Sequence, residues 1–219
     1  MIALIRYTFA TVLHTQRYVA PLLLFMGFLG ILTVNGSGPL PPAYASSGGA
    51  LFVCSTWLTI ALMSLDDPPQ RAIVVVSSGG RSLKVLLAAI ATALLSCLVL
   101  MVFGLVFPLL IGSYDVTAND LLLGVEAQLT CALVGIAIGV PCSRLLFKRQ
   151  GYALVAALAL VMAALFAKGM PPVNRLFTLM ATTPDAAKLL GPTAGMLLIA
   201  AVILVVFVAA TQFVATRRE

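Results

Sequence analysis

The sequence has few charged residues. Only 9% of its 219 residues are Asp, Glu, Lys or Arg, whereas 62% are hydrophobic, and the mean hydropathy is +1.13. A soluble domain carries about 25% charged residues, so this composition excludes an ordinary soluble domain. It also excludes a disordered chain, because such chains are poor in apolar residues. The composition therefore predicts an integral membrane protein.

Residues that perform bond chemistry are equally scarce. His14 is the only histidine, the spans contain no paired carboxylates, and the closest cysteines, Cys131 and Cys142, are 11 positions apart. We therefore expect no catalytic residue, no metal site and no disulfide. No glycine precedes a lysine, so the chain lacks a phosphate-binding loop. Any ATP and Mg²⁺ would be bound by a partner chain, and we expect neither a cofactor on this chain nor a nucleic-acid partner.

Six apolar segments have about the 20 residues that a membrane-spanning helix needs. They are Tyr18–Val34, Gly49–Leu65, Val85–Ile111, Leu121–Val140, Gly151–Phe166 and Thr193–Val214. We predict an all-α single transmembrane domain over residues 1–219, with a six-span bundle at 18–214 and a tail at 215–219. The first span followed by Ala43-Tyr44-Ala45 also resembles a signal peptide with its cleavage site. We favour a retained span, because the preceding region is long and itself patterned.

The positive charges are distributed unequally between the two sides of these spans. One side holds ten of the 13 lysines and arginines, namely Arg6, Arg17, Arg71, Arg81, Lys84, Arg144, Lys148, Arg149, Arg217 and Arg218. The other side holds Lys168, Arg175 and Lys188. Since positive residues resist translocation, the ten-charge side is predicted to be cytoplasmic. The chain is then a multi-pass protein of the cell membrane with both termini in the cytoplasm.

Residues 1–17 have the pattern of an amphipathic helix. Ile2, Ile5 and Phe9 recur at helical spacing, while Arg6 and Arg17 are among the polar positions. Such a helix is expected to lie in the cytoplasmic membrane interface with its arginines toward lipid headgroups. Arg6, Phe9 and Arg17 are therefore the candidate interfacial residues, and membrane lipid is a predicted partner.

The loop between spans two and three contains a short apolar element. Asp66-Asp67-Pro68-Pro69 is a helix-start signal, and the apolar run Ala72–Val76 that follows is too short to span a membrane. This element either packs under its own bundle or docks into a groove on a partner, and its β-branched run is also compatible with an extended chain. From the residues alone, these alternatives stay open.

Three further features lie in the fourth span and in the outer loop. Glu126 is the one charge inside a span; it either lines a substrate or proton path or reaches interfacial water. Gly135 and Gly139 form a small-xxx-small pair that allows close helix packing, which we expect to be within the chain. The segment Lys168–Gly191 is predicted to form two short helices, one over Asn174–Met180, at the outer surface or partly re-entering the membrane.

This layout resembles the membrane subunit of an ABC-2-type transporter (the type V exporter fold) over the whole chain. Residues 1–17 resemble that family's elbow helix, and residues 172–190 resemble its short outer re-entrant helices. The acidic pair Asp66-Asp67 and the later Ser77-Ser78-Gly79-Gly80-Arg81 match the outline of its cytoplasmic coupling helix, although the family's Gly-Thr is replaced by Ala72-Ile73.

The resemblance implies a permease subunit that pairs with a second permease subunit and rests on a separate ATPase (nucleotide-binding) subunit. It implies contact with the ATPase through Asp66, Asp67, Gln70, Arg71, Ile73, Val74, Val75 and Arg81. Haem-exporter subunits of cytochrome c maturation are similar in size, so the cargo stays open. Two other classes are the substrate-binding subunit of an energy-coupled importer, which would lack the elbow and acidic loop, and a membrane enzyme, which the missing chemistry disfavours.

Overall fold

A computed structural model describes residues 2–16, 18–33, 38–65, 68–77, 82–112, 114, 116–143, 150–183 and 185–217. These residues form helices and connecting turns, with no strand among them. The helices are α1 (Ile2–Thr15), α2 (Val19–Thr33), α3 (Leu40–Met63), α4 (Pro68–Ser77), α5 (Ser82–Ile111), α6 (Ala118–Gly139), α7 (Gln150–Phe166), α8 (Val173–Thr182) and α9 (Ala186–Thr216).

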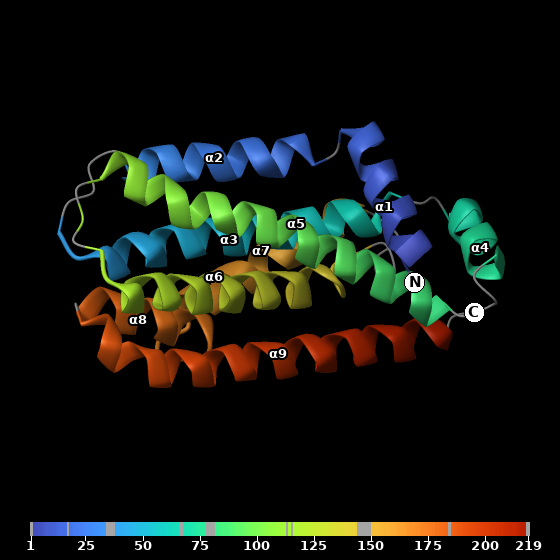
Figure 1. The fold of residues 1–219 in the computed structure, drawn as a ribbon. Coiled ribbons are helices and arrows are strands. Elements are labelled where there is room, and N and C mark those ends of the chain that lie inside the picture. Colours follow the sequence, from blue (N-terminus) through green and yellow to red (C-terminus); the bar gives the residue numbers. More distant parts are fainter. Residues whose placement is uncertain are drawn as a thin grey trace.

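The helices α2, α3, α5, α6, α7 and α9 run along one common direction (Figure 1). At one end, α1 lies across the bundle, α4 projects beyond it, and both chain termini are found (Figure 1). At the other end lie α8 and the turn between α5 and α6. Four helices, α3, α5, α6 and α9, are long and apolar enough to cross a membrane, and α2 and α7 are shorter apolar helices. This arrangement indicates a multi-pass membrane protein.

Among the four long helices, the more apolar ones are the less buried. α3 is the least apolar of the four and has 72% of its candidate span buried, whereas the much more apolar α9 has only 17% buried. In water the most apolar helices would occupy the core, because burial of apolar surface drives folding. Their exposure is expected when lipid replaces water around the protein, since lipid tails solvate apolar side chains.

α3 and α6 form the centre of the bundle and pack closely through small residues. A Cβ at Gly135 would lie 2.8 Å from the carbonyl oxygen of Phe52, and one at Gly139 would lie 2.9 Å from that of Thr56. The Ser55 hydroxyl, at the same contact, donates to the Phe52 carbonyl of its own helix. The two helix backbones therefore meet at the glycines, and the predicted close approach is confirmed as packing within the chain.

The start of α3, the second predicted span, was expected at Gly49, and this prediction is wrong. The helix begins at Leu40 rather than at Gly49. Pro41 is tolerated in the first turn because the amide hydrogens there need no partner within the helix. Leu40 and Tyr44 are buried, and Tyr44 lies against the position of Gly124 in α6. Tertiary packing thus makes helical a segment whose prolines, serines and glycines are typical of a loop.

Of the two short outer helices that were predicted, α8 is separate and the second is the beginning of α9. Asp185 caps α9 by accepting a hydrogen bond from the amide of Ala187 at 3.2 Å. The helix continues through Pro192 to Thr216. A proline nitrogen carries no hydrogen, so the helix lacks one backbone hydrogen bond at this turn. The two-helix prediction is therefore wrong in its second part.

α8 is held against the bundle by one apolar face. Val173, Leu176 and Met180, which recur every three or four residues, are buried. The ring of Phe177 lies within 4 Å of the positions that a Cβ on Gly48 or Gly49 of α3 would take. α8 thus covers the end of α3 opposite to α1 and α4 (Figure 1).

Candidate functional site

The predicted coupling segment forms α4, a helix that begins at Pro68. Proline is favoured at this position because its fixed φ suits the first helical turn. The structure thereby answers the choice between helix and extended chain in favour of the helix. Several predicted site residues lie outside the described residues, namely Asp66, Asp67, Arg81, Arg17 and the side chain of Arg71.

α4 presents two apolar side chains away from the bundle. Ile73 and Val76, three positions apart on the helix, are 70% and 76% exposed. Val74 and Val75 are partly buried and make interactions of their own. Of the three predicted apolar contact residues, Ile73 is therefore exposed for a partner while the other two are half-covered. Val76 was missed by the sequence analysis, because a run of consecutive valines does not reveal which one faces outward.

A side-chain hydrogen bond connects α4 to α1. The Gln70 amide donates from Nε2 to the Tyr7 hydroxyl oxygen at 3.2 Å, across 63 positions of sequence. α1 in turn packs against α5. Gln70 was predicted as a site residue, whereas Tyr7 was not, because its role depends on a distant partner.

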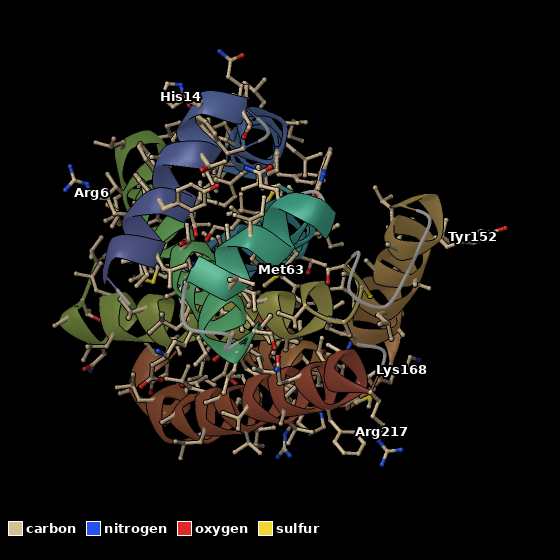
Figure 2. All side chains as sticks on the ribbon, turned by 90° about the vertical axis from the view of Figure 1, so that its right-hand side faces the viewer. Arg6, His14, Met63, Tyr152, Lys168 and Arg217 are labelled. Atoms are coloured by element: carbon tan, nitrogen blue, oxygen red, sulfur yellow. The ribbon has the colours of Figure 1, made fainter. Side chains whose placement is uncertain are left out.

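The polar side of α1 faces away from the bundle. Viewed from the end at which α4 lies, Arg6 and His14 project outward from the flank of α1 (Figure 2). Phe9 is 41% exposed, while Val12 is buried against the bundle. The helix thus separates an inward apolar side from an outward cationic side, as an interfacial helix does. Arg6 and Phe9 are both exposed, and their interfacial role stays a prediction.

Glu126 lies at the contact between α6 and α9. Its carboxylate oxygen Oε2 accepts a hydrogen bond from the Thr193 hydroxyl at 2.5 Å, and the side chain is partly buried. A carboxylate in a membrane span is costly unless it is solvated or paired, and this hydroxyl supplies one partner. The bond joins the two helices beside Pro192, where the α9 backbone lacks a donor. The structure therefore gives Glu126 a packing partner that neither of its two interpretations had named.

A second polar group is buried deeper in the same helix. The Gln128 side chain is fully buried, and its Nε2 donates to the Ser47 hydroxyl at 3.1 Å. Its Oε1 has no hydrogen-bond partner, and Gly104 of α5 leaves room for the amide, since a Cβ there would lie 2.6 Å from Oε1. The sequence could have marked Gln128 as a polar residue within a span, but not its partners.

The starts of α3, α6 and α9 surround a polar pocket of about 630 Å³ at the end opposite to α4. Asp120 lies in its wall, accepts hydrogen bonds from the backbone amide and hydroxyl of Thr117, and so caps α6. Asp185 caps α9 and pairs with Lys188 at 3.3 Å. Both carboxylates therefore stabilise helix N-termini.

No three His, Cys, Asp or Glu side chains among the described residues gather as metal ligands would. The four cysteines are free and buried. Comparison with protein-family models, with curated proteins and with solved structures finds no match for the chain.

Proposed function

We propose that the chain is the permease subunit of an ATP-driven exporter of the ABC-2 type, which pairs with a second permease subunit and is coupled to a separate ATPase subunit. The observation that carries this proposal is the exposed apolar pair Ile73 and Val76 on α4. An apolar helix face outside the bundle, at the end with both termini, is suited to a groove on a partner protein (Figure 1). The sequence itself has no phosphate-binding loop.

The distribution of charge supports a six-span layout with the α4 end in the cytoplasm. Arg6, Lys84 and Arg217 lie in elements that end or begin at the α4 end of the bundle (Figure 1). Lys188 lies in the first turn of α9 and Arg175 in α8, at the opposite end. In the span prediction from the sequence, ten of the 13 lysines and arginines belong to the side of Arg6, Lys84 and Arg217. The positive-inside rule then orients both termini to the cytoplasm.

The proposed mechanism is mechanical. ATP bound between the ATPase subunits closes them, and this closure displaces α4 through its apolar pair. The hydrogen bond between Gln70 and Tyr7 carries part of the displacement to α1. α1 and α4 both pack against α5, so the bundle receives the movement at its cytoplasmic end. The pair of permease subunits then alternates between two conformations of the substrate path.

The magnitude of the docking contact follows from the exposure of the two side chains. Full burial of an aliphatic side chain contributes about 1.5–3 kcal/mol. Since Ile73 and Val76 are about three-quarters exposed, covering both contributes about 2–4 kcal/mol to binding. An aspartate at either position removes this contribution and places a charge in an apolar groove.

The test is purification of the chain from its native membranes, through a tag, with an assay for an ATPase that co-purifies. We expect the unchanged chain to retain the ATPase and the double variant Ile73→Asp/Val76→Asp to lose it. Val116→Asp is the matched control, because Val116 is 48% exposed at the opposite end of the bundle. The proposal is wrong if no ATPase co-purifies with the unchanged chain, or if the double variant retains ATPase and transport as the control does.

A further inference from the structure

An apolar groove runs between α1 and the bundle. It has a volume of about 170 Å³ and opens to the outside of the protein. Its walls come from α1, α2, α3 and α5, and they are almost entirely carbon. The side chains that form it include Phe9, Val12, Leu22, Leu58, Ser96 and Val99.

The groove lies where an acyl chain can enter it from the membrane. Val99 is 55% exposed and belongs to the membrane-spanning helix α5, while Val12 closes the inner side and is 5% exposed. Phe9 forms the edge beneath α1 and is 41% exposed. An open apolar groove at this depth is filled by hydrocarbon rather than by water, because a cavity without polar groups does not hold water.

A cation lies one helical turn from Phe9. Arg6 is exposed and precedes Phe9 by three positions, so the two residues are neighbours on the surface of α1. Figure 2 shows Arg6 on the flank of α1, directed away from the bundle. An arginine at the polar boundary of the membrane attracts anionic headgroups. The groove and the arginine thus match the two parts of one phospholipid.

We infer that the groove binds one anionic phospholipid, with an acyl chain between α1 and α5 and the headgroup phosphate at Arg6. This inference depends on the membrane character of the chain and is independent of the proposed ATPase contact. The bound lipid fills the space beneath α1 and thereby holds that helix against α5.

The experiment is native mass spectrometry of the full chain, released from nanodiscs that contain equal amounts of phosphatidylglycerol and phosphatidylcholine with identical acyl chains. We expect the unchanged chain to retain one phosphatidylglycerol in preference to phosphatidylcholine. Val99→Trp fills the groove and should reduce retention of both lipids at least tenfold. Arg6→Gln should lower the preference for phosphatidylglycerol about fivefold, the factor that one cation near a membrane surface contributes.

Two control variants separate the site from general lipid contact. Val202→Trp adds the same side chain at a valine that is 62% exposed on α9, outside the groove. Arg217→Gln removes an exposed arginine that contacts the ring of Phe213 instead. Both should retain the lipid as the unchanged chain does. Equal retention of the two lipids by the unchanged chain, or equal retention by the groove variants and their controls, would overturn the inference.

Discussion

The contact between α3 and α6 can be tested by adding one methyl group. Gly135→Ala and Gly139→Ala each place a Cβ against a backbone carbonyl of α3, at 2.8 Å from Phe52 and 2.9 Å from Thr56. A Cβ within 3.0 Å of another heavy atom is closer than van der Waals contact allows, so both contacts are too short. A backbone carbonyl within a helix cannot rotate away as a flexible side chain does. The two helices must therefore separate to accept the methyl group.

The expected cost follows from this geometry. Overfilling a closely packed core lowers the free energy of unfolding by about 1–3 kcal/mol. Gly195→Ala is the matched control, because no atom lies within 4 Å of its added Cβ. There the substitution should stabilise the helix by about 0.5–1 kcal/mol, since alanine loses less backbone entropy than glycine. At about 2–4 °C per kcal/mol for a chain of this size, each test variant should lose about 2–12 °C in Tm.

The assay is thermal unfolding in detergent, followed by the fluorescence of Trp57, the single tryptophan, and by gel filtration. Trp57 lies on α3, one position from the carbonyl that Gly139 contacts. The close contact between α3 and α6 is refuted if Gly139→Ala is as stable as Gly195→Ala. It is also refuted if shortening the nearby Ser55 side chain restores Gly135→Ala, because the carbonyl of Phe52 would remain in place.

Two further predictions concern the polar contact of α9 and the orientation of the bundle. In a double-mutant cycle, Glu126→Ala and Thr193→Val should each lower Tm. The double variant should lose less free energy of unfolding than the sum of the two single variants, by about 1.5–3 kcal/mol, the contribution of a hydrogen bond to a charged group. Strictly additive losses would contradict the contact. A membrane-impermeant maleimide should label Lys188→Cys in intact cells and Arg217→Cys only after permeabilisation, and the opposite result would reverse the orientation. The native cysteines should stay unlabelled because they are buried, and burial raises the pKa of the Cys142 thiol, which disfavours the reactive thiolate.

Much of the helical layout could be predicted from apolar length alone. The third span, expected from Val85, begins at Ser82, and the fifth, expected from Gly151, begins at Gln150. In these segments the apolar run is bounded by residues that favour turns, so both signals predict the same helix boundary. The predicted start of a helix is wrong where local composition and packing disagree, as at the start of α3. There the buried ring of Tyr44 against α6 overrides residues that favour a loop.

The sequence predicts which segment forms the candidate site, but not which of its side chains are exposed. The apolar run Ala72–Val76 has no polar residue that would mark an outward face, so its sequence does not show that Ile73 and Val76 are the exposed pair. The partners of the polar residues were equally hidden. Gln70 and Tyr7 are 63 positions apart, and no local spacing relates them. Pairings across such distances depend on how the helices are arranged, which the periodicity of one segment does not contain.

α5 connects the proposed cytoplasmic helices α1 and α4 to the centre of the bundle. It contacts α1 and α4 at the proposed cytoplasmic end and α3 and α6 along the centre. Gly104 allows this central contact, because any larger residue would collide with the fully buried amide of Gln128. α3 and α6 are joined backbone to backbone at Gly135 and Gly139, so they respond as one unit. In the proposed mechanism, a displacement of α4 would reach this unit through α5, because α5 contacts α4 at one end and both central helices along its length.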